Sequence, residues 1–554
     1  MEVVVTPRGE QVVLDGEPCG RETLPFEALP GRVRDLETEH APRWVLSDTA
    51  RVYPQLVTAG VRIARSHDLR LARAVLDPGH ASDGAWDAPA HETREPTLLD
   101  GLAPELTADD LLAEHRRQRA AVADSPAPGR LRLLLAAESA GALAATEMSH
   151  DGLPWDRAVH DQVLTDLLGP RPHPGTRPRV LEALAAQVRD RVSAPSLNPD
   201  SAPELLRALQ SAGLEVDSTR KHELQRLDHP VIAPLLEYKR LARLLAANGW
   251  TWLDEWVRPL PGTAADGRAP GRFHPEYVVS GVVTGRWATS GGGALQLPKQ
   301  IRRAVVADAG WRFVVADAAQ LEPRVLAAMA GDEAMASAAR GSDLYQGLVD
   351  QGVVDTRAHA KVAMLGALYG STSGEAGRLM PRLMRAYPRA TGVVEEAARD
   401  GERGTPVRTW LGRPSPAPPP AWHEAQRRAG QEDAEAGEVR RARQAARDWG
   451  RFTRNFVVQG TAAEWASCWL ADLRGRLRSL GAGRTWSGPD GRIGPHLVFF
   501  LHDEVVVHTP ADVADEVAEA VRAAAGTAGQ LLFGTFPVEF PVEVSVVETY
   551  ADAD

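Results

Sequence analysis

The sequence predicts a multidomain protein, with a small α/β domain followed by a larger α+β body built on an antiparallel sheet. Short apolar runs of strand length alternate with longer segments of helical periodicity, and no repeat of solenoid length occurs. At 554 residues the chain is too long for a single core. Near the C-terminus, two apolar runs flank a short polar segment, a pattern typical of a hairpin in a buried sheet.

Residues 1 to about 125 are expected to form the small α/β domain. The expected elements are strands at 3–5, 12–14, 44–46 and 61–64, a helix through 53–57 and a polar helix over 107–123. Thr107 is a suitable N-cap for the last of these helices. The segment 124–129, rich in proline and ending in glycine, is expected to link this domain to the body.

The body is expected to be mainly helical, with strands that lead to the candidate site. The expected elements are a helix from 130 that stops at Asp151-Gly152, further helices to about 245, strands within 272–285, a strand at 313–316, a helix over 321–330 with Pro323 in its first turn, a helical region to about 400, a charged helix over 423–449, a buried helix over 456–478, a hairpin at 502, a helix over 513–525 and a strand at 542–547.

Composition excludes several classes of protein. The hydrophobic fraction of 44% and the charged fraction of 25% are ordinary for a soluble globular chain. Two distant cysteines, Cys19 and Cys468, fit a reducing cytosol and argue against a disulfide scaffold. Without a basic leader or an apolar run of about 20 residues, neither a signal peptide nor a membrane span is expected. A net charge of −11 still allows a locally positive cleft.

Two aspartates at strand ends form the first candidate site. Asp317 follows the apolar run 313–316, and His502-Asp503-Glu504 separates the apolar runs 497–501 and 505–507. If these strands are neighbours, Asp317 and Asp503 meet at one edge of a sheet. Such a pair can hold two Mg²⁺ ions about 4 Å apart for in-line phosphoryl transfer. A lone aspartate after a strand is more often a turn residue or a helix cap.

A second candidate site is one face of the predicted helix over 357–369. Arg357, Lys361, Leu365 and Tyr369 are each four residues apart and therefore share a face. A triphosphate could lie along the two cations while a base rests near the leucine and tyrosine. Lysine is rare in this arginine-rich chain, and Lys361 and Lys299 are two of only four. Alone, such a face is more often that of an ordinary amphipathic helix.

Two polar segments suit contact with a nucleic-acid backbone and the minor groove. The residues concerned are Arg286, Gln296 and Lys299 in a glycine-rich loop, and Arg451, Asn455 and Gln459 on one face of a predicted helix.

Together these motifs resemble those of family A DNA polymerases of the DNA polymerase I type. The segment Asp317-Ala318-Ala319-Gln320-Leu321-Glu322-Pro323-Arg324 resembles the first palm motif, and His502-Asp503-Glu504 resembles the last. The helix over 357–370 resembles the nucleotide-binding fingers helix. The segments 237–242, 284–286 and 459–463 resemble further signatures of the family. The motifs therefore occur in the family's order over about 130–554.

The resemblance implies a palm-fingers-thumb body with an antiparallel palm sheet. The implied parts are a thumb at about 130–240, a palm at about 241–325 and 451–554, and fingers at about 326–450. Residues 1–125 would then be a degenerate, RNase H-like 3′-5′ exonuclease-like domain.

The resemblance also implies roles for individual residues. Asp317 and Asp503 would bind two Mg²⁺ ions, with Mn²⁺ as an alternative, and Glu504 would support that site. Lys361 would also protonate the leaving pyrophosphate, and Glu322 would exclude the 2′-hydroxyl of a ribonucleotide. The implied dNTP contacts are Arg357, Lys361, Leu365, Tyr369, Glu322, Gln320 and Tyr345. The implied DNA contacts are Arg286, Gln296, Lys299, Arg451, Asn455, Gln459 and His502.

The sequence departs from the family pattern at several positions. Leu365 replaces an aromatic residue that packs on the incoming sugar, Tyr345 stands where a phosphate-contacting histidine is common, and Ala294 replaces an asparagine. In the N-terminal domain, the segments 15–17 and 35–37 have Asp-x-Glu spacing but neither lies on a convincing buried strand, and Ala72 replaces the final aspartate of a second exonuclease motif. Proofreading is therefore expected to be lost.

The sequence thus predicts a cytoplasmic, nucleoid-associated DNA polymerase for repair or replication. It is expected to act as a monomer on primer-template DNA, with dNTPs and Mg²⁺. Two alternatives on the same fold are an RNA-synthesising relative, which Glu322 disfavours, and a non-catalytic DNA-binding relative, which should lack one of the two metal-binding aspartates.

Overall fold

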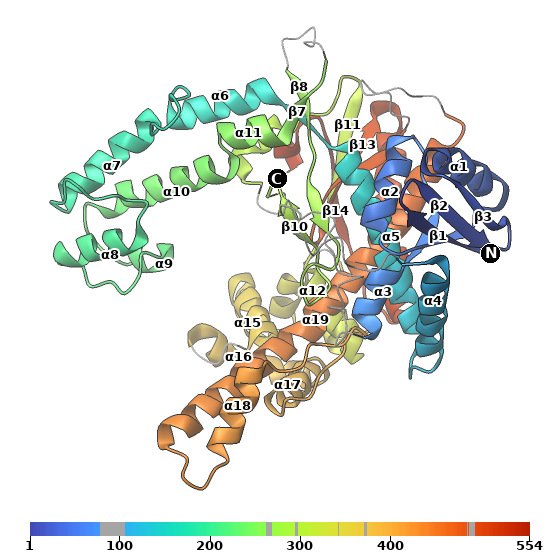
Figure 1. Cartoon of the computed structure of the whole chain (residues 1–554). Coiled ribbons are helices and arrows are strands. Elements are labelled where there is room, and N and C mark those ends of the chain that lie inside the picture. Colours follow the sequence, from blue (N-terminus) through green and yellow to red (C-terminus); the bar gives the residue numbers. More distant parts are fainter. Residues whose placement is uncertain are drawn as a thin grey trace. The chain divides into compact units, whose positions relative to one another are not determined.

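A computed structural model describes residues 1–77, 106–261, 269–293, 297–341, 343–370, 374–484, 486 and 494–553 (Figure 1). The chain divides into two compact units. The first unit comprises Met1–Asp151, Glu276–Ser290 and Gly310–Val546, and the second comprises Gly152–Pro275, Gly291–Ala309 and Val547–Asp554. None of the described helices is long and apolar enough to cross a membrane.

The N-terminal part of the first unit is a five-stranded sheet with the strand order β3-β2-β1-β4-β5, drawn in blue in Figure 1. Strands β1 to β3 are antiparallel, whereas β4 and β5 run parallel to β1. The strands are β1 Glu2–Arg8, β2 Gln11–Gly16, β3 Gly20–Pro25, β4 Arg43–Leu46 and β5 Arg65–Asp68. The helices are α1 Leu29–His40, α2 Thr49–Thr58, α3 Leu69–Leu76 and α4 Ala108–Ala123.

Several predictions for this part are confirmed and two are wrong. Thr107 caps α4 in a capping box, as its sequence predicts. The strand predicted at 61–64 instead occupies Arg65–Asp68, where the buried residues are the polar Ser66 and Asp68 and so give no apolar signal. Strand β3 was not predicted, because none of its residues is fully buried. The segment predicted as a linker is shorter than expected, since α5 begins at Pro128.

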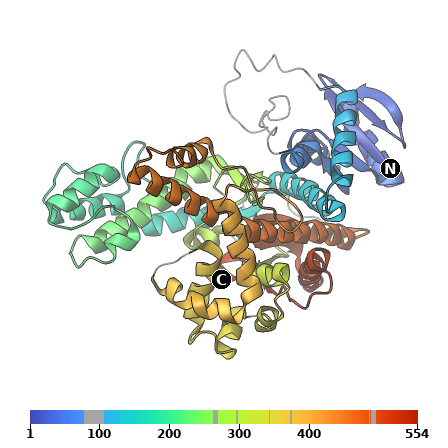
Figure 2. The same ribbon diagram turned by 90° about the horizontal axis from the view of Figure 1, so that it is seen from below.

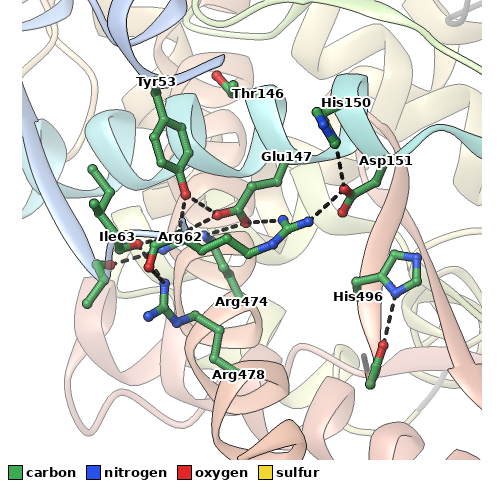
Figure 3. A network of polar contacts seen from close by, with 12 residues as sticks. Tyr53, Arg62, Ile63, Thr146, Glu147, His150, Asp151, Arg474, Arg478 and His496 are labelled. Atoms are coloured by element: carbon green, nitrogen blue, oxygen red, sulfur yellow. Dashed lines mark hydrogen bonds and ion pairs between the residues drawn. The ribbon is translucent and has the colours of Figure 1, made fainter. Parts of the chain in front are cut away.

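Helix α5 (Pro128–Asp151) lies beside the C-terminal half of α19 (Ala436–Gly481), as Figure 2 shows for the cyan and red-brown helices. A buried polar network joins both helices to α2 and to the segment between α2 and β5 (Figure 3). In it, Arg474 of α19 donates to both oxygens of Glu147 on α5, at 2.9 and 2.7 Å, and to the carbonyl oxygen of Ile63 at 2.6 Å. The Tyr53 hydroxyl donates to the same carboxylate at 2.5 Å.

The charges of this network are mutually compensated. Burial alone would raise the pKa of Glu147, but Arg474 and Arg62 outweigh it and lower the pKa to about 2. Arg62 also binds Asp151 at 2.7 Å. The network therefore fixes α5 and α19 against α2 and the segment that follows it, through groups whose separation would weaken the pairing of buried charges.

A four-stranded sheet with the order β12-β13-β11-β14 forms the centre of the first unit. The strands are β11 Trp311–Ala318, β12 His496–Leu501, β13 Glu504–Pro510 and β14 Val542–Val547. The predicted hairpin at 502, the strand at 542–547 and the helix at 321–330 (α12, Leu321–Ala330) are confirmed. Helix α20 (Ala514–Phe533) is longer than predicted. A second, two-stranded sheet pairs β9 (Glu276–Val278) with β10 (Ala288–Gly291).

The remaining helices of this unit are α13 Glu333–Ala338, α14 Leu344–Asp350, α15 Arg357–Tyr369, α16 Gly374–Ala386, α17 Pro388–Glu402 and α18 Pro420–Ala429. Three of them, α15, α17 and α18, pack against α19, and the others pack on neighbouring helices. The predicted charged helix over 423–449 is wrong, because α18 ends at Ala429 and a single helix then runs from Ala436 to Gly481. Gly450 does not interrupt α19. A Cβ atom at Gly450 would lie 2.8 Å from the carbonyl oxygen of Ala398, so glycine there allows α17 and α19 to approach closely.

The second unit contains a helical array and a three-stranded sheet with the order β6-β8-β7. Its elements are β6 Leu153–Asp156, α6 Arg157–Leu168, α7 Arg179–Arg191, α8 Ala202–Ser211, α9 Lys221–Leu224, α10 Ile232–Asn248, α11 Trp250–Trp256, β7 Val257–Pro259, β8 Pro270–Phe273 and the 3₁₀ helices Lys299–Ala304 and Tyr550–Ala553. Trp155, Trp252 and Phe273 pack together at its sheet.

Candidate active site

The two aspartates predicted to meet at a sheet edge come from neighbouring strands. Strand β11 pairs with β13 in antiparallel register, and Asp317 stands opposite Glu504. The carbonyl oxygen of Asp503 accepts a hydrogen bond from the Ala318 backbone N–H at 2.9 Å. The predicted pairing of these two strands is therefore confirmed. It places Asp317, Asp503 and Glu504 at one end of the central sheet.

Negative charge is concentrated at this edge. Partial burial and the charges of Asp503, Glu504 and Glu543 raise the pKa of Asp317 to about 7. Desolvation is the largest cause of this rise, and the three neighbouring carboxylates add to it. Burial also raises the pKa of Asp503, against the opposing charge of Arg286. Carboxylates that raise one another's pKa in this way would be stabilised by bound cations.

Two carboxylates at one sheet edge are a set of ligands that a divalent cation can use. Within the described ranges, no group of three or more His, Cys, Asp or Glu side chains could hold a metal ion. Mg²⁺ typically uses one or two carboxylates and completes its octahedron with water and substrate phosphates. In the part of the chain that the structure describes, no hydrogen bond or salt bridge reaches the Asp317 carboxylate, which leaves its oxygens available.

His502 lies in the turn between β12 and β13 with φ +58°, a left-handed conformation that is uncommon for a residue with a side chain. The turn is closed by a hydrogen bond from the Asp503 N–H to the carbonyl oxygen of Leu501 at 2.7 Å. Desolvation and the charge of Arg286 lower the pKa of His502, so the imidazole is favoured in its neutral form beside the carboxylates.

Three of the predicted substrate and DNA contacts form one polar cluster. The Arg286 guanidinium donates to Glu322 at 2.5 Å, and the Tyr369 hydroxyl donates to the other oxygen of Glu322 at 3.2 Å. Burial raises the pKa of Tyr369, and the Gln459 side chain opposes that rise. Arg286 from a loop and Tyr369 from α15 thus hold the Glu322 carboxylate of α12 between them.

The predicted stripe on α15 is exposed along its length. Arg357 and Lys361 are exposed, as are Leu365 at 37% and Tyr369 at 42%. Ala360, Ala363 and Ala367 on the opposite face are buried. An exposed leucine beside an exposed tyrosine, continuing a row of two cations, is unusual for a helix whose other face packs against the protein.

The predicted DNA-contact face of α19 also remains accessible. Arg451 is exposed, and Asn455 and Gln459 are partly exposed, while residues 453–454 and 456–458 are buried. Gly370, at the C-terminal end of α15 with φ +71°, lies against this face, since a Cβ atom there would be 3.0 Å from Arg451 Cγ. Gln296 lies outside the described residues, and Lys299 belongs to the second unit.

A buried ion pair packs against the loop that carries Arg286 and supports it. Arg413 binds Glu138 of α5 at 2.7 Å, and the Ser280 hydroxyl donates to the same carboxylate at 2.5 Å. Gly285 has φ +84°, and a Cβ atom there would lie 2.8 Å from Arg413 Nε. The loop can therefore lie directly on the Arg413 guanidinium only because residue 285 is glycine.

Comparison with known proteins agrees with this geometry. The model of DNA polymerase family A matches residues 181–552, about two thirds of the chain. The chain belongs to DNA polymerase family A. Among curated relatives, the thermostable DNA polymerase I of Thermus filiformis is 29% identical over 350 residues, which cover 58% of this chain and 36% of that protein. DNA polymerase I of Chloroflexus aurantiacus is 29% identical over 346 residues, covering 57% and 32%.

The fold is that of the family's polymerase domain. The POL domain of Pol1 from M. smegmatis, solved as a complex with DNA primer-template and dNTP, aligns with a TM-score of 0.69 and 19% identity, covering 100% of this chain and 95% of that one. The matches with the curated relatives cover only about a third of their length.

Sequence reasoning missed several residues of this family A site. Glu543 of β14 adds a carboxylate beside Asp317, Asp343 binds Arg357, and the Arg413–Glu138 pair supports the Arg286 loop. Asp343 lies two residues before Tyr345, inside a segment that the motif comparison already covered. The Arg413–Glu138 pair joins residues 275 positions apart, for which a single sequence carries no signal.

Proposed function

We propose that this chain is a DNA-directed DNA polymerase that adds dNTPs to a primer 3′ end. The observation that carries the proposal is the meeting of Asp317 and Asp503 at the sheet edge, where the pKa of Asp317 rises to about 7. Family membership and the polymerase-domain fold support it. The DNA polymerase I name of the curated relatives points to the same reaction.

Asp317 and Asp503, with Glu504 in support, would hold two Mg²⁺ ions. Bound there, the ions would activate the primer 3′ hydroxyl and neutralise charge on the transferring phosphoryl group. Arg357 and Lys361 on the exposed face of α15 would bind the triphosphate, and Lys361 would protonate the pyrophosphate as it leaves.

The polar cluster around Glu322 would select the sugar and hold the base pair. Glu322 is held by Arg286 and Tyr369, and its fixed carboxylate would exclude a 2′-hydroxyl. This favours deoxynucleotides and argues against the RNA-synthesising alternative. Leu365 and Tyr369 would contact the incoming nucleotide, and Tyr345 would serve the phosphates. The remaining DNA contacts would be Arg286, Gln296, Lys299, Arg451, Asn455, Gln459 and His502.

We also propose thumb, palm and fingers at about 130–240, 241–325 with 451–554, and 326–450. The N-terminal sheet would be a degenerate exonuclease-like domain, because its acidic residues have other tasks. Asp15 pairs with Arg21 at 2.6 Å, and Asp68 caps α3 and accepts a hydrogen bond from the Thr49 N–H at 2.8 Å. Consequently no Mg²⁺-dependent trimming of a single-stranded 3′ end is expected, and trimming that disappears in Asp68→Asn would contradict this.

Primer extension by aspartate variants tests the main proposal. Asp317→Asn and Asp503→Asn should each abolish extension in Mg²⁺, because the amide cannot replace an anionic metal ligand. Both variants should still bind primer-template DNA in a gel-shift assay. The exposed Asp515→Asn on α20 serves as the control with one carboxylate removed. Extension at the wild-type rate by either active-site variant would refute the assignment.

A further inference from the structure

Among the described residues, the arginine proposed above to bind the triphosphate is held through its Nε edge. Arg357 Nε donates to Asp343 Oδ2 at 2.6 Å, and its guanidinium carbon lies 5.7 Å from the centre of the Tyr345 ring. Within the described residues, neither Nη group of Arg357 has a hydrogen-bond partner. The guanidinium is therefore oriented through its inner nitrogen, while its outer fork stays available for a phosphate.

The carboxylate that holds Arg357 is itself fixed. Asp343 Oδ1 accepts hydrogen bonds from the backbone N–H groups of Tyr345 at 3.0 Å and Gln346 at 3.2 Å, which caps α14. The two oxygens thus have separate tasks, since Oδ1 caps the helix and Oδ2 binds the arginine. Burial opposes ionisation, but the hydrogen bonds from Arg357 and the α14 backbone lower the pKa of Asp343.

Gln320 connects this arrangement to the carboxylate edge of the sheet. It follows the end of β11 with φ +52°, and its side-chain amide reaches α14. Gln320 Nε2 donates to Asp343 Oδ1 at 3.1 Å, and Gln320 Oε1 accepts from the Leu344 N–H at 2.7 Å. Both ends of the amide are engaged, so this side chain supports Asp343.

We infer that Asp343 is a positioning residue for the incoming nucleotide, holding Arg357 by Nε so that its outer fork faces the triphosphate. Gln320 acts through Asp343 in the same role. The inference rests on the proposed polymerase function. Pre-orienting a long side chain reduces the ordering that must occur when substrate binds, and the benefit appears in nucleotide affinity more than in the chemical step.

Asp343→Asn separates the two tasks of this carboxylate. Asparagine keeps Oδ1 and remains a good N-cap, but its Nδ2 amide would face the N–H donor of Arg357. The KM for dNTP should rise about five- to tenfold while kcat stays within about twofold of wild type. Asp156→Asn is the matched control, because Asp156 caps α6 through Oδ1 alone.

A double-mutant cycle with Arg357→Ala shows whether Asp343 acts through the arginine. In that background Asp343→Asn should have no further effect on KM. An equal effect with and without Arg357, or a loss of thermal stability that Asp156→Asn does not cause, would overturn the inference.

Binding of dNTP to a complex with a dideoxy-terminated primer separates the inference from the proposed function, because no chemistry can occur. Weaker binding by Asp343→Asn supports the inference even if wild type fails to extend a normal primer, a failure that would refute the polymerase proposal alone. Unchanged binding refutes the inference alone.

Discussion

Glu464 should make the stability of the first unit depend on pH, because this buried carboxylate forms no ion pair with any residue that the structure describes. It lies on α19, where Oε2 accepts a hydrogen bond from the Leu411 N–H at 2.9 Å and Oε1 accepts one from the Thr409 hydroxyl. Burial raises its pKa to about 7, against these two hydrogen bonds and the charge of Arg413, while the charge of Glu138 adds to the rise.

The sign and size of the effect follow from this shift. A carboxyl whose pKa is raised in the folded state contributes stability below its ordinary pKa near 4.5, and that contribution is lost as the pH rises through about 7. At about 1.4 kcal/mol per pKa unit, the full effect is about 3 kcal/mol. Most of it, about 2 to 3 kcal/mol, falls between pH 5 and pH 8.

Glu464→Gln should remove this dependence. Its amide can donate to the Thr409 hydroxyl as a protonated carboxyl would, and it does not ionise. Both proteins should be unfolded in urea at pH 5, 6, 7 and 8. Between pH 5 and pH 8 the free energy of unfolding of the variant should rise by about 2 to 3 kcal/mol relative to that of wild type. Glu519→Gln, at an exposed carboxylate on α20, is the control and should follow wild type. A constant difference between Glu464→Gln and wild type across this range would refute the reasoning.

Three further predictions concern the site and its supports. Glu322→Ala should raise the ratio of ribonucleotide to deoxynucleotide incorporation in competition assays, because the carboxylate held by Arg286 is removed; an unchanged ratio would contradict the sugar-gate role. Arg474→Met should destabilise the first unit by about 3 kcal/mol in denaturant unfolding, since the buried Glu147 loses its two-pronged partner and keeps the weaker ion pair with Arg62 at 3.8 Å, and adding Glu147→Gln should recover part of that loss. Gly285→Ala should cost about 1–2 kcal/mol from its left-handed backbone alone and slow primer extension by displacing Arg413; wild-type rates would show that the loop tolerates the change.

The sequence predicts those parts of the structure that local chemistry determines. The strand before Asp317 is a short apolar run, and α12 has Pro323 in its first turn and Gly331 as its C-cap, so its bounds could be predicted. Strand β5 could not, because its buried residues are polar. Gly450 suggests a helix break by propensity, but tertiary packing against α17 makes glycine the residue required there.

The candidate site was predictable in its motifs but not in its supports. Residues such as Arg357 and Glu322 stand at spacings that indicate their chemistry. Asp343, Glu543 and Glu138 are ordinary acids in sequence, and their relevance depends on which distant cation or carboxylate the fold brings beside them. Pairing of polar groups between remote segments is a property of the tertiary structure.

The uninterrupted length of α19 restricts how this chain can vary. Its 46 residues form a continuous helix about 69 Å long. Gln459, which lies beside Tyr369, and Arg474, which binds Glu147, both belong to this helix. One residue inserted or deleted between them would rotate one side chain relative to the other by about 100° around the helix axis. The helix is continuous between these two residues, so no loop there could compensate for the rotation. Natural variation in length should therefore fall outside this helix, whereas substitutions within it that respect its faces remain possible.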